Sequence, residues 1–242
     1  MPTVEQVLGL ALLGGVLALD RTAFLQAMIS RPLVGSTAAG HLLGDPAMGL
    51  TCGLLLELLW LLDLPVGASV PADEALAGVL APVFALASPA GWAPEARAAA
   101  GVLAAVPFGL LGRRVDVAVR RWNDALVQTA RRKAAGGLAP GLGRCQAIGA
   151  ARFFGFGAAL SGAGAWAGSW AMARWARGLP AEASWALEIT EALLPLVGAA
   201  GALAAWRGIG ARRLFTWGVA AGWGMSAAGA PGSPGGGRLW GG

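Results

Sequence analysis

The sequence has little charge. Asp, Glu, Lys and Arg together make up 13% of the 242 residues, whereas apolar residue types make up 56%. An ordinary soluble domain carries roughly 25% charged residues. The composition therefore excludes such a domain and predicts an all-α, polytopic integral membrane bundle, because backbone polar groups inside a bilayer are satisfied most simply within helices.

Cysteine and histidine are also scarce. The two cysteines, Cys52 and Cys145, lie far apart among small or apolar neighbours, without metal-ligand spacing. We therefore expect neither a disulfide nor a metal site. The only histidine, His41, lies in the apolar sequence GHLLGD. We expect it to be packed or hydrogen-bonded, not to act as a phosphorylated nucleophile. No Walker-type loop is present, so ATP-driven transport lacks support and no cofactor is predicted.

Basic residues outnumber acidic ones, 18 to 13. They cluster in short segments between apolar runs and do not form the basic face of a nucleic-acid-binding domain, so no nucleic acid partner is expected. The segment Arg113–Lys133 carries seven basic and two acidic residues, and Val119, Trp122 and Leu126 recur in it at helical spacing. We predict a basic amphipathic segment over 113–146 that lies on the cytoplasmic membrane surface with its Trp stripe packed inward.

The apolar runs fall at 4–19, 48–64, 74–87, 96–111, 147–172, 183–206 and 214–228. A full crossing needs about 20 residues, and several runs are shorter, so re-entrant or broken helices are expected within about six to nine spans. The first run lacks a basic n-region and is predicted to be a span, not a removed signal peptide. We predict one membrane domain over 1–228 and a flexible Gly/Pro-rich tail at 229–242.

A spaced series of polar and small residues interrupts the apolar sequence near its start. The series consists of Arg31-Pro32-Leu33, Gly40, Leu43-Gly44-Asp45, Gly49, Leu56-Glu57 and Gly67-Ala68 followed by Asp73. Hydropathy alone does not produce such a series. With it, the first part of the chain resembles the membrane subunit IIC of the mannose/fructose/sorbose class of the bacterial sugar phosphotransferase system (PTS). Length, hydropathy and the basic central segment agree over the remainder.

This resemblance implies a multi-pass permease subunit in the bacterial inner membrane that binds a sugar and carries it across with a companion membrane subunit, IID. Cytoplasmic IIA and IIB components would relay phosphate from phosphoenolpyruvate to the sugar, and IIC and IID would assemble into homo-oligomers of the pair. The chain itself shows no phosphoryl-carrier residue, which leaves open whether it should be called an enzyme. The alternative is a transport-inactive scaffold or regulatory homologue. A proton-coupled secondary transporter is disfavoured, because no second half resembles the first.

Three carboxylates, Glu57, Asp63 and Asp73, are the candidate sugar contacts. Each lies in or beside a short apolar run, where a carboxylate is costly, and carboxylates accept hydrogen bonds from sugar hydroxyls. A structural alternative exists for two of them: Glu57 as the buried partner of Arg31, and Asp73 as the N-cap of a helix that starts at Glu74.

A re-entrant hairpin is predicted around these carboxylates, and its structural residues are Arg31, Pro32, Gly44, Asp45 and Gly67. Asp45, which precedes a proline, has the form of a helix cap.

Two positions depart from the pattern of the mannose members. Those proteins carry amides three residues before Arg-Pro and two before the Gly-Ala turn, where this chain has Met28 and Pro65. Gln26 and Asp63 lie two residues from these positions and are candidate substitutes, although two residues turn a helical side chain by about 200°. Mannose itself is therefore not assigned, and another hexose or an amino sugar remains open.

Overall fold

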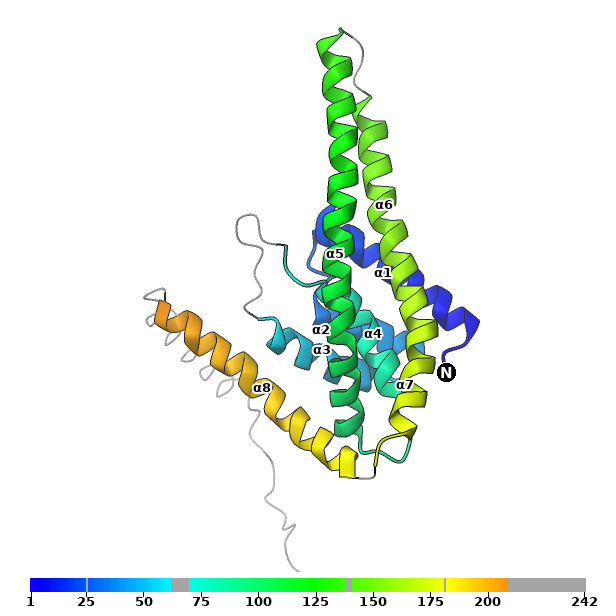
Figure 1. The fold of residues 1–242 in the computed structure, drawn as a ribbon, viewed down its shortest axis with the longest axis vertical. Helices are drawn as coiled ribbons and strands as arrows, with labels where there is room; N and C mark the ends of the chain where they lie inside the picture. The colour runs from blue at the N-terminus through cyan, green and yellow to red at the C-terminus, as the bar shows by residue number, and fades with distance from the viewer. Residues whose placement is uncertain (25, 62–69, 138–140, 181, 209–242) are drawn as a thin grey trace, which may run out of the picture. The chain divides into compact units, whose positions relative to one another are not determined.

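A computed structural model describes residues 1–24, 26–61, 70–137, 141–180 and 182–208. Regular structure in these ranges is entirely helical, as predicted (Figure 1). The elements are α1 (Val4–Thr22), α2 (Pro32–Leu43), α3 (Pro46–Leu59), α4 (Glu74–Ala87), α5 (Pro94–Ala135), α6 (Leu142–Ala163), the π-helical turn η1 (Gly164–Gly168), α7 (Ser169–Arg177) and α8 (Glu182–Gly208). The chain divides into a unit over Met1–Gly198 and a second over Ala199–Gly242. Only the end of α8 is described in the second unit, so the predicted run at 214–228 and the tail at 229–242 lie outside the described residues.

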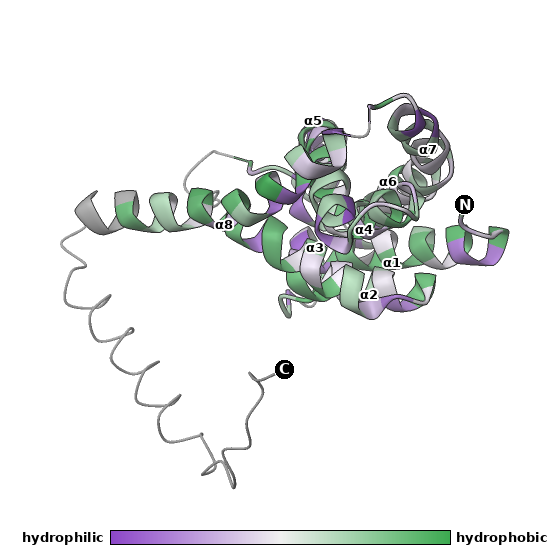
Figure 2. Cartoon of the chain, turned by 90° about the horizontal axis from the view of Figure 1, so that it is seen from below, coloured by the Kyte–Doolittle hydropathy of each residue, from purple (hydrophilic) through white to green (hydrophobic). Residues whose placement is uncertain are grey.

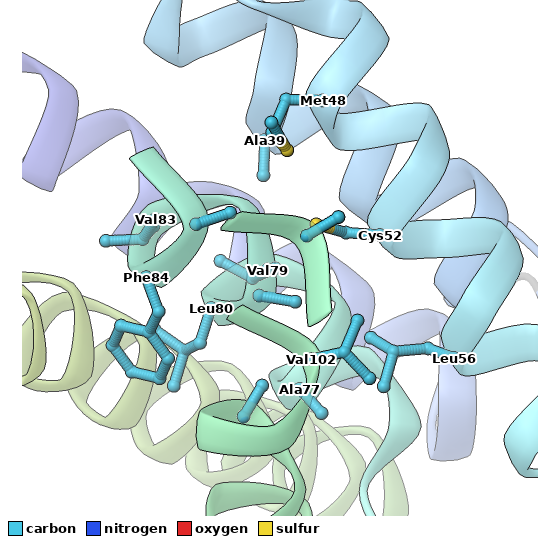
Figure 3. Close-up of a cluster of buried hydrophobic side chains, with 14 of the residues drawn as sticks. Ala39, Met48, Cys52, Leu56, Ala77, Val79, Leu80, Val83, Phe84 and Val102 are labelled. Atoms are coloured by element: carbon cyan, nitrogen blue, oxygen red, sulfur yellow. The ribbon is translucent and has the colours of Figure 1, made fainter. Parts of the chain in front are cut away.

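Helix α4 forms the centre of the first unit. Every residue from Ala75 to Ala85 is buried, because α1, α2, α3, α5 and α7 all pack against this helix. Its side chains Val79, Leu80 and Phe84 join residues of α2, α3 and α5 in the hydrophobic core (Figure 3). A helix that is apolar on all sides is stable only when it is enclosed, and α4 has this composition.

Helices α2 and α3 form a hairpin that is too short to cross a bilayer. With 12 and 14 residues they are about 18 and 21 Å long, against a hydrocarbon core of about 30 Å. Gly44 ends α2 in the left-handed region (φ 87°), and the Asp45 carboxylate accepts a hydrogen bond from the N–H of Met48 at 2.9 Å to cap α3. The predicted re-entrant hairpin is therefore a pair of short helices, with Arg31 and Pro32 at its entrance.

Two glycines let the backbones of this hairpin touch. A Cβ atom at Gly49 would lie 2.5 Å from the carbonyl oxygen of Ser36, and one at Gly40 would lie 2.7 Å from the Cα of Gly49. Both distances are far below van der Waals contact. The sequence did not indicate α2 by hydropathy, because this helix is built mainly from small residues that serve close packing.

Helix α5 continues without a break for 42 residues, although Pro107 lies inside it. The apolar run at 96–111 and the basic segment after it are therefore one helix, about 63 Å long. Its second half pairs with α6, and the two helices run side by side beyond the rest of the first unit (Figure 1). The basic segment thus continues the direction of the apolar run, which differs from the predicted surface-lying helix.

The contacts between α5 and α6 also change the predicted inward stripe. Val119 is buried, and Asn123 and Leu126 are half-buried, whereas Trp122 is 51% exposed and packs its ring against Phe156 at 5.4 Å. The buried positions recur at alternating spacings of three and four residues, which is the spacing of paired helices. That spacing places Trp122 at the edge of the contact.

By length and composition, Glu182–Leu203 in α8 is the one candidate membrane span among the described residues. Hydrophobic residues dominate this helix (Figure 2). Large side chains along it, such as Trp185, Leu193 and Leu196, are exposed to more than half of their area. Such an apolar exterior is typical of a helix that meets lipid or another membrane protein.

Candidate functional site

Charged side chains from five helices converge where α4 begins. They belong to the end of α1, the start of α2, the end of α3, the start of α4 and the middle of α5. We call this group the charge cluster; its members are Arg21, Arg31, Glu57, Asp73, Glu74, Asp116 and Arg120. Such groups are costly within a membrane protein unless they pair or line a ligand pathway.

The deep half of the charge cluster is organised by Arg21. One guanidinium nitrogen lies 3.4 Å from the Asp73 carboxylate and 3.6 Å from that of Asp116. The other donates to the carbonyl oxygens of Pro71 and Ala72, at 3.1 Å each. The Arg21 and Asp116 side chains are 12% and 5% exposed. Arg21 thus joins α1 to α5 and to the segment that enters α4.

Asp73 holds the first turn of α4 against α5. Its carboxylate accepts a hydrogen bond from the N–H of Leu76 at 3.1 Å, and its own N–H donates to the carbonyl of Gly109 at 2.9 Å. A Cβ atom at Gly112 would lie 2.5 Å from the Cβ of Asp73, so only glycine permits this approach. The N-cap alternative for Asp73 is therefore what the structure shows.

The open half of the charge cluster is organised by Arg31. Its guanidinium lies 2.7 Å from Glu57 and 3.4 Å from Glu74, and the three side chains are 38%, 23% and 20% exposed. Glu57 also accepts a 3.4 Å hydrogen bond from the N–H of Leu33, in the first turn of α2. Arg31 and Glu57 thus form the pair that the sequence offered as a structural alternative.

Carboxylates exceed guanidinium groups in the charge cluster. Four carboxylates, those of Glu57, Asp73, Glu74 and Asp116, face three arginines, and Arg120 binds Asp116 through two hydrogen bonds of 2.9 and 3.2 Å. An ionised carboxylate has about four lone-pair sites. In the open half, Glu57 and Glu74 retain acceptor sites that Arg31 does not occupy. This half can accept hydrogen bonds from a polar, uncharged ligand.

The four predicted sugar contacts, Glu57, Asp63, Asp73 and Gln26, have different outcomes. Glu57 and Asp73 belong to the charge cluster, in its open and deep halves. Gln26 is exposed, and its side chain forms no hydrogen bond to a described member of the charge cluster. Asp63, together with the hairpin residue Gly67, lies outside the described residues.

Several members of the charge cluster were missed from the sequence. Glu74 was assigned only to the start of a helix, although it directly follows a predicted site residue. Arg21 and Asp116 carried a usable signal, because each is an ionisable residue on a helix that packs within a membrane protein. What the sequence could not provide is their mutual contact, which depends on the packing of both α1 and α5 against α4.

The loop between α1 and α2 has an unusual backbone. Gln26 and Met28 adopt positive φ angles of 53° and 62°, which non-glycine residues seldom do. Asp20, only 3% exposed, holds this loop by accepting hydrogen bonds from the N–H groups of Ala27 at 2.7 Å and Ser30 at 2.9 Å. Strained backbone of this kind gathers at functional sites, and this loop leads directly to Arg31.

Other predicted chemistry lies away from the charge cluster. His41 is exposed on α2, and Cys52 and Cys145 are both free thiols. No group of three or more potential metal ligands occurs among the described residues.

Comparison with known proteins places the chain among PTS components. The family model described as "PTS system sorbose-specific iic component" matches residues 4–207. The mannose-specific EIIC components of Escherichia coli K12 and Shigella flexneri are 30% identical over 107 residues, which is 44% of this chain and 38% of theirs. The matched part is thus well under half the length of these relatives.

Two solved structures share the fold. One, described as a membrane protein, aligns with a TM-score of 0.62 at 19% identity, covering 96% of this chain and 90% of its own. The other, a mannose transporter ManYZ in complex with microcin E492, aligns with a TM-score of 0.57 at 20% identity, covering 96% and 89%. The chain therefore has the helical fold of a membrane protein.

Proposed function

Because the chain belongs to the family of PTS sorbose-specific IIC components, we propose that it is the sugar-binding and translocating membrane subunit of a phosphoenolpyruvate-dependent phosphotransferase system of the mannose/fructose/sorbose class. The curated relatives are mannose-specific EIIC components, which supports a hexose or a related sugar as the substrate. The match covers only 38% of their length, so the substrate is to be identified by the reconstitution experiment below.

The open half of the charge cluster is the observation that carries this proposal. Arg31 precedes α2, Glu57 lies near the end of α3, and Glu74 begins α4. The three side chains meet where the re-entrant hairpin adjoins the start of α4. Broken and short helices bring polar groups to membrane depth in transporters, and the ends of such helices surround the solute. A sugar offers neighbouring hydroxyl groups as donors, and Glu57 and Glu74 offer carboxylate oxygens as acceptors. Asp63 and Gln26 belong to the segments that adjoin this half in the chain.

Asp73 takes a different part in this proposal. Its carboxylate already caps α4 and pairs with Arg21. We assign it to positioning the first turn of α4, and therefore the adjacent Glu74, instead of to direct contact with the sugar.

The proposed partners follow from the same function. The chain would work with a IID membrane subunit, in oligomers of the pair. Cytoplasmic IIA and IIB proteins would relay phosphate to the sugar that the pair carries. The chain would cross the bacterial inner membrane several times, with residues 113–152 in the cytoplasm. We call these residues, the second half of α5 and the start of α6, the basic hairpin. The concentration of basic residues in 113–133 supports that orientation through the positive-inside rule.

Reconstitution tests the function directly. The chain is co-expressed with its IID and IIB partners, and inverted membrane vesicles are prepared from the cells. Phosphoenolpyruvate-dependent phosphorylation is then measured over a panel of hexoses, sorbose and amino sugars. At least one sugar should be phosphorylated only when the chain is present. Phosphorylation of no sugar by a complex that assembles normally would instead assign the chain to a scaffold or regulatory role.

A further inference from the structure

An apolar cavity lies near the end of α4 that is opposite to the charge cluster. It has a volume of about 470 Å³ and is bordered by α4, α5, η1, α7 and the start of α8. Its walls include Phe84, Leu103, Phe108, Met172 and Trp175. The indole N–H of Trp175 is the one hydrogen-bonding group on the side chains that line it. A sugar would lose its hydrogen bonds to water here without replacement, so this cavity is not a second sugar site.

The backbone of η1 shapes this cavity. At Gly168 a Cβ atom would lie 2.5 Å from the ring of Phe84, so the absence of a side chain allows that ring to lie against the π-helical turn. The same ring packs at 5.3 Å from the ring of Phe108 on α5. Together the two rings form an aromatic wall. Single π-helical turns within α-helices are often found at functional sites.

The rim of the cavity is open and apolar. Leu103 on α5 is 45% exposed and Trp175 on α7 is 54% exposed. From Ala100 to Phe108 the wall formed by α5 is about 12 Å long. A volume of this size falls in the usual range of ligand cavities, about 300 to 1,000 Å³. An elongated hydrocarbon chain fits this shape and this lining.

A cation lies next to the rim. Arg174 follows Ala171, which lines the cavity, by three positions, so the two are neighbours on the surface of α7. Arg174 is exposed and forms no ion pair with any described residue. It is adjacent in sequence to Trp175, and Trp with Arg is the combination found at the interface between lipid tails and head groups.

The position of the cavity along the bundle agrees with this assignment. The end of α7 and the start of α5 lie at the same end of the first unit, opposite to the basic hairpin along α5 (Figure 1). If Arg113–Lys133 marks the cytoplasmic side, the rim with Arg174 lies toward the outer head groups, and the cavity extends from there into the hydrocarbon region.

We propose that this cavity binds one acyl chain of an anionic glycerophospholipid whose phosphate contacts Arg174. The apolar walls select a hydrocarbon chain, and the guanidinium of Arg174, which pairs with no described carboxylate, selects a negative head group. The site is independent of the sugar site, because the residues that line it are not shared with the charge cluster. A helix of a companion membrane protein in the same place is the competing occupant, and the experiment below separates the two.

Photolabelling and native mass spectrometry test the proposal. The full chain, purified with its membrane partner in mild detergent, is incubated with phosphatidylglycerol that carries a diazirine in one acyl chain. After illumination, the adducts should map to the peptides that contain Leu103 and Met172. In native spectra, wild-type protein should retain one phosphatidylglycerol more than Ala171→Phe, whose ring fills the cavity at its rim. The matched control is Ala163→Phe, at an exposed position of α6 outside the cavity, which should retain the lipid as wild type does.

The head group is tested with a pair of arginine variants. Arg174→Gln should weaken phosphatidylglycerol retention at least tenfold, whereas Arg177→Gln, whose guanidinium donates to the Ala173 carbonyl at 2.9 Å, should change it less than twofold. Size-exclusion profiles establish that each variant is folded. Equal lipid retention in Ala171→Phe and Ala163→Phe, or labelling spread evenly over the helices, would overturn the proposal. So would photo-crosslinks from a reactive residue at 175 that reach a second polypeptide and not lipid.

Discussion

Arg21, at the end of α1, lies 3.6 Å from Asp116, in the middle of α5, and both side chains are almost fully buried. The contact joins two helices that are distant in the sequence, and Asp73 and Arg120 extend it on either side. A buried ion pair contributes little net stability over an apolar pair, but the loss of one partner leaves an uncompensated charge. This asymmetry makes the pair testable.

Arg21→Met should lower the free energy of unfolding by about 3 to 5 kcal/mol, because Asp73 would lose its cation and the buried Asp116 would keep only Arg120. The double variant Arg21→Met with Asp116→Leu should recover part of that loss, because only Asp73 would then remain buried without its cation. Thermal unfolding in detergent measures both. Arg114→Met, an exposed arginine of α5 without a described ion pair, is the matched control, with an expected change within about 0.5 kcal/mol. Additive single-variant effects in the double variant would contradict the assigned pairing.

Glu57→Gln and Glu74→Gln should each weaken sugar binding by about 1.5 to 3 kcal/mol, the usual contribution of a hydrogen bond to a charged group. Asp63→Asn is the third variant of this series. Sugar affinity of the purified complex is measured by isothermal titration calorimetry. Glu95→Gln serves as the control, because Glu95 also lies in the first turn of a helix but outside the charge cluster.

The pairing of Arg31 with Glu57 adds a second readout to that series. Arg31→Met combined with Glu57→Leu should recover most of the folded yield that Arg31→Met alone loses, because the closest partner at 2.7 Å is removed with it and only Glu74, at 3.4 Å, loses its cation. Sugar binding by this double variant should nevertheless be absent. Unchanged affinity in the double variant and in all the amide variants would remove these residues from the sugar site.

Gly49→Ala should destabilise the α2–α3 hairpin by about 1 to 3 kcal/mol, since the new methyl group would meet the Ser36 carbonyl oxygen at 2.5 Å and neither backbone can move aside easily. The control is Gly155→Ala, at an exposed position in the middle of α6, where a Cβ atom would have no neighbouring atom within 4 Å. There alanine should stabilise the protein by up to about 1 kcal/mol through helix propensity. Detergent unfolding curves compare the two, and equal effects would show that the close approach in the hairpin is not needed.

The orientation of α5 is tested by cysteine labelling of intact cells, in a background without Cys52 and Cys145. A cysteine replacing Gly136, at the end of α5, should react with a membrane-impermeant maleimide only after the cells are permeabilised. A cysteine replacing Gly91, in the segment before α5, should react without permeabilisation. Neither glycine has a positive φ, so both substitutions suit the backbone. Reversed labelling of the two positions would invert the proposed topology.

His41→Gln should leave sugar phosphorylation by the reconstituted complex within about twofold of wild type, because an isolated imidazole outside the charge cluster has no part in the proposed sugar contacts. Labelled phosphoenolpyruvate should place no stable phosphate on this chain. Phosphohistidine recovered at His41 would show that the chain takes part in the phosphate relay.

Local signals in the sequence predicted the ends of several elements well. The apolar run at 74–87 coincides with α4, and Asp73 and Asp45 cap helices as their positions before Glu74 and Pro46 indicated. Caps depend on neighbouring residues alone, so a sequence carries them directly. Arg31 and Glu57 could also be proposed as a pair, because both belong to the same hairpin.

Features that depend on distant packing could not be predicted in the same way. Hydropathy treats α5 as two segments, since the composition changes near Gly112, yet the backbone hydrogen bonding continues across that point. The partners of Arg21 come from α4 and α5, and no spacing in the sequence relates them. The exposure of Trp122 likewise follows from the register of α5 against α6, in which Val119 and Asn123 are the more buried positions.

Because α5 is one uninterrupted helix, a tilt at one point of it moves its far end by a larger distance. One stretch of this helix borders the apolar cavity, another touches the first turn of α4 through Gly109 and Gly112, and its far end forms the tip of the basic hairpin. A rod about 63 Å long that tilts by about 5° moves its end by about 5 Å. A small displacement of α4 against α5 is therefore enlarged at the tip, where a fluorophore or spin label would record it as a change in distance.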